Sequence, residues 1–347
     1  MSSLTQTSTI PDAVHPAVRL RELTCGYWIS QCIAVAARLG VADLLKSGSK
    51  SVQDLAAATE TQVRPLYRLL RALAGFGIFA EGPNGYFNLT PMAELLETSP
   101  HSLRGWAILL GYETNWHRAW DELLHSLKTG EPAVPRVMKM NYRDYLAGNP
   151  EAAALFNDGL TAYTGQLARA IVNAYDFSAF GKLVDVGAGH GTLMAAILTA
   201  TPQLTGIVFD LPHAREGARK TLEAANVDMR CEVVAGDFFN AVPEGGDAYL
   251  LSHVIHDWSD ERALDILRNC RRVMKPNGRL LVVEAVIPPG NDPFFAKLLD
   301  MHMLVVTDQG ADRTEGEYRS LIEQAGFRLP RVLPTSSDVS IIEGVPV

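Results

Sequence analysis

Side chains that can bind a cofactor or accept a proton follow three short apolar segments in the C-terminal half of the chain. Asp210 ends residues 206–210, Asp237 and Phe238 follow residues 231–235, and His253 and His256 follow residues 248–251. Apolar segments of this length are typical of buried parallel strands, and open α/β sheets bind ligands at the carboxyl ends of such strands. Carboxylates there suit ribose hydroxyls, an aromatic ring suits a flat base, and a histidine can take up a proton near neutral pH.

A glycine-rich turn precedes these segments. Residues 182–186 predict a strand that is buried on both faces, and GAGHG at 187–191 leads into a helix predicted over residues 192–200. Glycines let a ligand approach the backbone closely, and the free N–H groups of the helix would face that ligand. Asp210 follows Gly187 by 23 residues, close to the spacing of about 20 at which an acid meets a ribose.

The spacing of the turn separates two classes of cofactor. It reads G-x-G-x-G, whereas the dinucleotide fingerprint is G-x-G-x-x-G, and Thr192 occupies the position of the third glycine. This departure disfavours a nicotinamide dehydrogenase. A purely structural turn is an alternative for this stretch alone, but the acids and histidines at the strand ends favour a binding site.

Four motifs in this order resemble those of class I S-adenosylmethionine-dependent O-methyltransferases, in the branch of the plant caffeate and acetylserotonin enzymes and the bacterial natural-product enzymes of the polyketide and phenazine type. The motifs are VDVGAGHG at 184–191, FDLP at 209–212, GDFF at 236–239 and HDWSD at 256–260. The resemblance runs roughly from Val18 to Ile342. It implies an α/β fold, with a C-terminal Rossmann-like seven-stranded methyltransferase sheet and an N-terminal, mainly helical winged-helix dimerisation domain. It also implies S-adenosylmethionine as cofactor, S-adenosylhomocysteine as product and no metal.

The resemblance implies catalytic roles for three residues. His256 matches the general base of the plant enzymes and of many bacterial ones, and Glu284 matches the glutamate that holds this histidine. The family places a second glutamate before an Arg-Thr pair, where this chain has Asp312. Because aspartate has one methylene fewer, its reach to the histidine is open.

The resemblance also places the cofactor and the acceptor. Trp258 could flank the adenine or belong to the core, and Tyr112 and Trp116 could line the acceptor pocket or the core. Since His253 replaces a tryptophan and Thr307 an asparagine of the plant pattern, we do not expect a monolignol precursor as acceptor. The cofactor candidates are Asp185, Gly187, Gly189, Asp210, Leu211, Asp237, Phe238, Ser252 and Trp258, and the acceptor candidates are Tyr112, Trp116, Phe156, Leu160, His253, Met303 and Thr307.

The elements that position these residues fall into two expected domains after a disordered stretch at 1–15. Residues 16–175 predict a helical winged-helix domain for dimerisation and for covering the substrate, and residues 176–347 predict the cofactor-binding domain. Residues 16–45 are apolar nearly all round a helix, so they are buried in their own core or in a partner subunit. A winged helix can also bind DNA, but residues 50–94 carry balanced charges and no basic stripe, and the family forms homodimers through this region.

Composition excludes several classes of protein. A formal charge of −8 disfavours binding to nucleic acid. Four scattered cysteines indicate reduced thiols. No apolar run is long enough to span a membrane, and residues 1–15 lack the pattern of a secretory signal. We therefore expect a cytoplasmic homodimer whose partner is a small aromatic substrate, with no nucleic acid or membrane bound.

The leading interpretation is an O-methyltransferase that acts on a phenolic or enolic hydroxyl of a small aromatic natural product. An S-adenosylmethionine-binding regulatory or repurposed protein on the same scaffold, which no longer transfers a methyl group, is the alternative. The presence of both His256 and Glu284 favours the enzyme.

Overall fold

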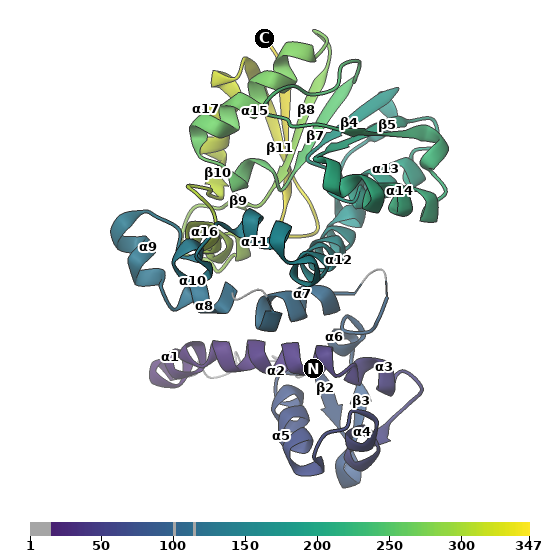
Figure 1. Ribbon diagram of the computed structural model, residues 1–347, viewed down its shortest axis with the longest axis vertical. Coiled ribbons are helices and arrows are strands. Elements are labelled where there is room, and N and C mark those ends of the chain that lie inside the picture. The colour runs from purple at the N-terminus through teal and green to yellow at the C-terminus, as the bar shows by residue number, and fades with distance from the viewer. Residues whose placement is uncertain (1–14, 100–101, 114–115) are drawn as a thin grey trace, which may run out of the picture. The chain divides into compact units, whose positions relative to one another are not determined.

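A computed structural model gives the structure of the chain and describes residues 15–99, 102–113 and 116–347, with only the backbone at Tyr112, Glu113 and Arg143 (Figure 1). The chain divides into two compact units, Met1–Glu97 and Thr98–Val347. The second unit contains the helices between residues 104 and 174, which the sequence assigns to the N-terminal domain. These helices belong to the second unit because the longest of them packs on a helix that covers the sheet.

The N-terminal unit is helical, with a small antiparallel sheet in the order β1-β3-β2. Its N-terminal helical region is interrupted at Cys25 and at Gly40, whose φ of +66° favours glycine. Ser51 caps the N-terminus of α4, because its hydroxyl accepts a hydrogen bond from the Asp54 amide. The elements are α1 (Pro16–Thr24), α2 (Gly26–Arg38), α3 (Val41–Leu45), β1 (Lys50–Ser51), α4 (Val52–Ala58), α5 (Val63–Ala74), β2 (Phe79–Glu81), η1 (Pro83–Gly85), β3 (Tyr86–Leu89) and α6 (Pro91–Glu94).

The second unit is built on a seven-stranded sheet, as the sequence predicts, in the order β11-β12-β8-β7-β4-β5-β6. The first five strands of this sheet in chain order are parallel, and β12 is antiparallel to both of its neighbours. The strands are β4 (Lys182–Val186), β5 (Thr205–Asp210), β6 (Cys231–Ala235), β7 (Ala248–Ser252), β8 (Arg279–Glu284), β11 (Phe327–Pro334) and β12 (Ser340–Pro346).

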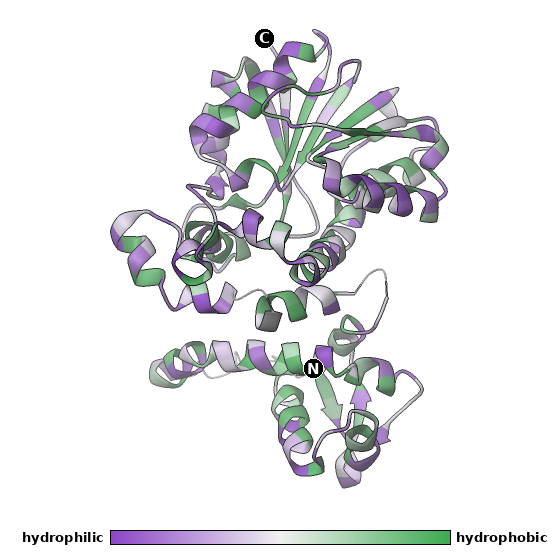
Figure 2. Cartoon of the chain, in the orientation of Figure 1, coloured by the Kyte–Doolittle hydropathy of each residue, from purple (hydrophilic) through white to green (hydrophobic). Residues whose placement is uncertain are grey.

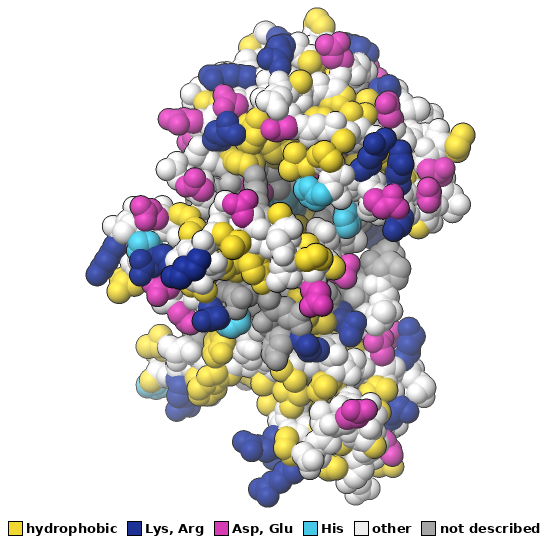
Figure 3. Space-filling model, in the orientation of Figure 1, with side chains coloured by type: hydrophobic (Ala, Val, Ile, Leu, Met, Phe, Trp, Pro, Cys, Tyr) yellow, Lys and Arg dark blue, Asp and Glu magenta, His cyan; other side chains and the backbone are white. Residues whose placement is uncertain are grey.

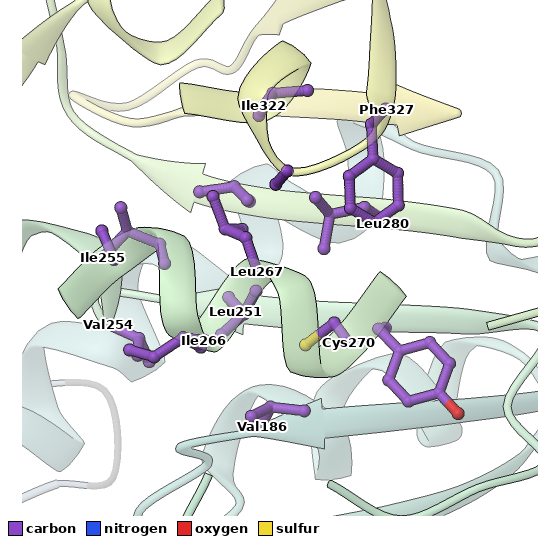
Figure 4. Close-up of a cluster of buried hydrophobic side chains, with 14 of the residues drawn as sticks. Val186, Leu251, Val254, Ile255, Ile266, Leu267, Cys270, Leu280, Ile322 and Phe327 are labelled. Carbon is purple, nitrogen blue, oxygen red and sulfur yellow. The ribbon is translucent and has the colours of Figure 1, made fainter. Parts of the chain in front are cut away.

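Helices cover both faces of this sheet, because successive strand residues point to opposite faces. Val184 and Val282 belong to one apolar cluster, with residues of α15 and α17, whereas Leu183 and Val283 belong to a second, with residues of α12, α13 and α14. Figure 4 shows the first cluster, and Figure 2 shows that the strands themselves are mainly hydrophobic. The helices are α12 (Pro150–Ala174), α13 (Thr192–Ala200), α14 (Arg215–Ala224), α15 (Asp260–Val273) and α17 (Glu315–Gln324), and η4 (Pro212–Ala214) and η5 (Asp228–Arg230) join them to the strands.

The second unit also contains shorter helices, several of which precede α12 in the sequence. Residues 142–174 form two helices that are separated at Asn149, whose side chain caps α12. None of the helices in the described residues is long and apolar enough to cross a membrane. The remaining elements are α7 (Arg104–Ile108), the π-helical turn η2 (Leu109–Glu113), α8 (Trp116–Trp120), α9 (Leu123–Thr129), α10 (Val134–Met138), α11 (Tyr142–Gly148), η3 (Phe177–Ala179), η6 (Ile255–Asp257), β9 (Val286–Ile287), α16 (Phe295–Val306) and β10 (Arg313–Thr314).

Candidate active site

Glu284 organises the loop that carries His256. Because β7 and β8 are parallel neighbours with Ser252 opposite Val283, the loop after β7 passes the Glu284 side chain. Its Oε1 accepts hydrogen bonds from three successive amides, at 3.2 Å from Val254, 2.9 Å from Ile255 and 3.3 Å from His256. This fully buried carboxylate therefore fixes the backbone of the short helix η6 as well as facing the imidazole.

Asp312 is the hydrogen-bond partner of the His256 ring. Its Oδ1 lies 3.2 Å from Nδ1, whereas Oε2 of Glu284 lies 3.6 Å away. The short parallel pair of β9 and β10, with Arg313 opposite Val286, brings Asp312 beside Glu284. The aspartate therefore reaches the histidine although it is shorter than the glutamate of the family pattern.

The two carboxylates favour the protonated form of His256. Burial lowers the pKa of His256. The charge of Glu284 and the hydrogen bond that the ring donates to Asp312 outweigh this effect and hold the pKa well above its ordinary value. Burial raises the pKa of Glu284, and the charge of His256 opposes this change. Nδ1 is engaged by the carboxylates, so Nε2 is the ring nitrogen that is left for an acceptor, with the nearest carboxylate oxygen, that of Asp257, 3.8 Å away.

One ligand atom each of His256, Glu284 and Asp312 lies within 4.8 Å of the others, which is close enough for a small metal ion. Hydrogen bonds account for the arrangement, because Nδ1 contacts Asp312 and Oε1 of Glu284 holds three amides.

Arg313 holds the ends of the same loop. This arginine is 3% exposed and donates to the carbonyl oxygens of Ile255 at 3.2 Å and Trp258 at 2.8 Å, and it pairs with Asp260 at 2.8 Å. Arg313 is a positioning residue that was not among the sequence candidates, although it belongs to the Arg-Thr pair that directly follows Asp312.

The glycine turn is packed at one glycine and open at another. Gly187 has a φ of +77°, and a Cβ there would lie 2.7 Å from Val254 Cγ2 and 3.5 Å from the Phe238 ring. A Cβ at Gly189 would meet no atom of the described residues within 4 Å. Asp210 is held at the same edge of the sheet, where its carboxylate accepts from the amides of Gly189 at 2.7 Å and Leu211 at 2.6 Å.

Further cofactor candidates gather around this turn. Asp185 is buried, and burial followed by the charge of Asp210 raises its pKa to about 8. The rings of Phe238 and Trp258 meet edge to face with centroids 6.1 Å apart, so Trp258 lies beside the proposed adenine pair. The Asp237 carboxylate accepts from the Phe239 amide at 2.9 Å, and the Ser252 hydroxyl lies 3.3 Å from His253 Nδ1.

One group of rings adjoins His256, and a second is built around His302 of α16. The His253 ring meets His256 and Tyr163 edge to face, with centroids at 5.4 and 5.3 Å. Burial followed by the His256 charge lowers the pKa of His253 to about 3, so this ring is neutral. The second group is an aromatic cluster formed by Trp116, Tyr142, Phe156 and His302.

The other acceptor candidates are placed differently. Leu160 is 38% exposed, and Met303 is buried in a small cluster with Leu299. The Thr307 hydroxyl is engaged locally, because it donates to the Met303 carbonyl and accepts from the Gly310 amide. The side chain of Tyr112 lies outside the described residues.

Three ring residues beside the site were not among the sequence candidates: Tyr142, Tyr163 and His302. Tyr163 follows Phe156 by two helical turns, which is a spacing that could have indicated it. It also borders a cavity of about 490 Å³ that Trp106 and Asp338 help to line. Tyr142 and His302 have no such signal, because they belong to helices that are distant in the sequence.

Comparisons with known proteins agree with this architecture. A model of the O-methyltransferase domain matches residues 120–328, and a model of the O-methyltransferase dimerisation domain matches residues 21–99. The chain is 46% identical over 329 residues to phenazine O-methyltransferase PhzM of Lysobacter antibioticus, which covers 94% of this chain and 96% of the relative. It is 33% identical over 327 residues to phenazine-1-carboxylate N-methyltransferase of Pseudomonas aeruginosa, with 94% and 96% covered.

A solved structure extends the agreement to the whole fold. CalO1, a methyltransferase of calicheamicin biosynthesis in its S-adenosylhomocysteine-bound form, matches with a TM-score of 0.86 and 36% identity, covering 95% of this chain and 98% of that one. The fold and the relatives confirm the resemblance seen in the motifs. The chain belongs to the O-methyltransferase family and is a methyltransferase whose cofactor is S-adenosylmethionine.

Proposed function

We propose that the protein methylates a phenolic or enolic hydroxyl of a small aromatic natural product, with His256 as the general base. The observation that carries this proposal is the buried imidazole, engaged at Nδ1 by Asp312 and Glu284 and beside the ring of His253, which in turn meets the ring of Tyr163. Such a site suits a flat acceptor whose hydroxyl must lose a proton.

The strand ends suit the cofactor. A Cβ at Gly189 would meet no atom of the described residues within 4 Å, which leaves the backbone of the turn open to a ligand at this position. Asp210 retains lone pairs for the ribose hydroxyls, and Asp237, Phe238 and Trp258 would hold the adenine. Asp185, Gly189, Leu211 and Ser252 complete the proposed wall. When bound, S-adenosylmethionine supplies a methyl group on a sulfonium, which an in-line nucleophile can accept.

The residues around His256 would govern the proton of the acceptor. The carboxylates of Asp312 and Glu284 stabilise the imidazolium that forms once His256 has taken the proton of the hydroxyl. Because the pKa of His256 lies above neutral, an acidic phenol would bind as its oxyanion against an imidazolium that is already charged. Both routes end with the same pair of charges, and the surrounding rings exclude water from it.

The relatives support an aromatic acceptor. One relative is named a phenazine O-methyltransferase and another a phenazine-1-carboxylate N-methyltransferase. An acceptor nitrogen is therefore the competing possibility. The buried base favours oxygen, since a phenolic hydroxyl must lose its proton and a tertiary ring nitrogen carries none. Tyr112, Leu160, Met303 and Thr307 remain candidates for the acceptor wall.

We also propose a homodimer, formed through the exposed apolar side of α1 and α2, within the region that the dimerisation model matches. The four cysteines are free thiols, which suits the reducing cytoplasm.

A methyl-transfer screen tests the activity. Protein dialysed against a chelator would be incubated with labelled S-adenosylmethionine and panels of hydroxylated phenazines, aromatic polyketides and plant-like phenols. We expect transfer to at least one hydroxyl without added metal. Calorimetry should show binding of S-adenosylhomocysteine and none of NAD. Binding of S-adenosylhomocysteine without transfer to any acceptor would favour the regulatory alternative.

A further inference from the structure

We propose that the indole N–H of Trp116 and the hydroxyl of Tyr142 together bind a carbonyl oxygen of the acceptor, away from the hydroxyl that is methylated. This inference rests on the proposed function, because it assigns a chemical group to the same acceptor.

The two donors lie on neighbouring rings of the aromatic cluster. The centroids of Trp116 and Tyr142 are 5.0 Å apart, and the Phe156 ring stands edge-on to both, at 5.8 and 5.4 Å. Trp116 is 6% exposed. Its Nε1 and the Tyr142 hydroxyl oxygen are both buried without a hydrogen-bond partner among the described residues. A buried polar group without a partner costs roughly 1–3 kcal/mol, so a ligand atom that pairs with both would relieve an existing penalty.

Both groups offer hydrogens. The indole nitrogen is a donor only, and a neutral tyrosine hydroxyl can donate one hydrogen. Burial, followed by the neighbouring Tyr145, raises the pKa of Tyr142 far above its ordinary value, so its hydroxyl keeps its proton. The ligand atom must therefore be an acceptor.

The chemistry of the pair favours a carbonyl oxygen over two other acceptors. A carbonyl oxygen has two lone pairs for two donors, whereas a ring nitrogen has one. A carboxylate would carry its charge into a buried site between two neutral donors, and burying a charge without a paired cation is costly. A neutral carbonyl, as in a quinone, xanthone or amide, is left.

Helix α16 connects the donors with the partner of the reacting histidine. Its Asp300 accepts from the amide of Asp312 at 3.2 Å, and His302 on the same helix meets the Trp116 ring edge-on at 4.9 Å. Burial followed by the positive charge of His256 lowers the pKa of His302 to about 4, so this ring is neutral. An acceptor that presents its hydroxyl to His256 would extend along α16 and present its carbonyl to Trp116 and Tyr142.

The test compares acceptors that differ in one group. Wild type, Trp116→Phe, Tyr142→Phe and the double variant would be assayed with a hydroxyxanthone, the corresponding hydroxyxanthene, which lacks the carbonyl, and a hydroxyphenazine, which offers ring nitrogens. Each single variant should raise KM for the hydroxyxanthone about three- to tenfold, the loss expected for one neutral hydrogen bond, with kcat within about twofold. KM for the hydroxyxanthene should not change. The double variant should show less than the product of the two effects, because both donors share one oxygen.

Tyr145→Phe is the matched control. This neighbouring tyrosine lies on the same helix, and its hydroxyl already accepts from Asn149 at 3.3 Å, so its loss should leave both KM values unchanged. Affinity for S-adenosylhomocysteine should be equal in all variants, which shows that they fold.

Several results would overturn the inference. Equal rises of KM for the hydroxyxanthone and the hydroxyxanthene would mean that the rings serve only in packing, and a rise confined to the hydroxyphenazine would mean that a ring nitrogen is bound. Calorimetry with S-adenosylhomocysteine present keeps the inference apart from the proposed activity. If no methyl transfer occurs but the hydroxyxanthone binds more tightly than the hydroxyxanthene, and Tyr142→Phe removes that difference, the carbonyl assignment holds and the proposed function fails. Absence of any difference in binding overturns the carbonyl assignment.

Discussion

At the residue scale, the proposed reaction depends on His256. His256→Ala and His256→Gln should lower kcat by about 10²–10⁴, the usual range for the loss of a general base. The residual rate should rise with pH, since a phenol that ionises in solution no longer needs the base. Affinity for S-adenosylhomocysteine, measured by calorimetry, should hardly change. A variant that keeps more than about half of the wild-type kcat at neutral pH would show that alignment alone accelerates the transfer.

Asp312 tunes the same imidazole. Burial lowers the pKa of His256 and the charges and hydrogen bond of Glu284 and Asp312 raise it, so Asp312→Asn should lower it. The neutral base would then form at lower pH, and the acid limb of the profile of kcat/KM should move toward lower pH. The same phenol, which ionises near pH ~10, would serve for wild type and variant, so that a difference between their limbs reports on the histidine. Asp312→Glu, which keeps the charge, should leave the limb near its wild-type position; a limb that stays in place in Asp312→Asn would show that the two groups are not coupled.

The residue scale also shows what the sequence could and could not predict. The family resemblance grouped His256 with Glu284 and left the reach of Asp312 open. The structure brings all three side chains together, because His256 and Glu284 follow neighbouring parallel strands and the pairing of β9 with β10 places Asp312 beside them. The division of labour between the two carboxylates depends on distances of a few tenths of an ångström, 3.2 against 3.6 Å, which no spacing in a sequence encodes. Tyr142 and His302 were missed because tertiary packing of separate helices, rather than periodicity, places them.

At the scale of elements, the turn after β4 permits a decisive test. Gly187→Ala should weaken binding of S-adenosylhomocysteine at least tenfold, because the new Cβ would meet Val254 at 2.7 Å and the φ of +77° is strained for alanine. Gly130→Ala is the matched control, since Gly130 has a φ of +74° but no atom within 4 Å of the position of its Cβ. Calorimetry should show normal binding for the control. Similar affinity in both variants would place the ligand away from the turn.

The strands and their order were predictable, whereas helix ends were less so. Apolar runs located four of the five parallel strands to within a residue or two, because strands that are buried on both faces consist mainly of apolar residues. The helical region predicted at residues 16–45 is divided into shorter helices, and so is the stretch at residues 142–174. In the second, Asn149 caps the helix that Pro150 begins, since proline favours the first helical position. Apolar periodicity continues through such a break, so it cannot reveal it.

At the scale of the whole molecule, charge and apolar surface point to different kinds of partner. On the face that Figure 3 shows, basic and acidic side chains are interspersed, which agrees with the net charge of −8 and disfavours a polyanion. The N-terminal unit instead exposes large apolar side chains on α1 and α2, including Leu23, Tyr27 and Trp28, each 60–65% exposed in the single chain. Patches of this kind mark protein interfaces.

The last prediction concerns this apolar surface. The wild-type chain should sediment at micromolar concentration as a dimer, and Trp28→Asp should shift it toward monomer, because a buried carboxylate without a partner opposes association. Met229→Asp is the control: Met229 is 92% exposed on the sheet-bearing unit, outside the region that the dimerisation model matches, so this variant should remain a dimer. If the wild type sediments as a monomer, the homodimer is wrong and the apolar face of α1 and α2 needs another partner. If both variants dissociate equally, the interface extends beyond these helices to the region around Met229.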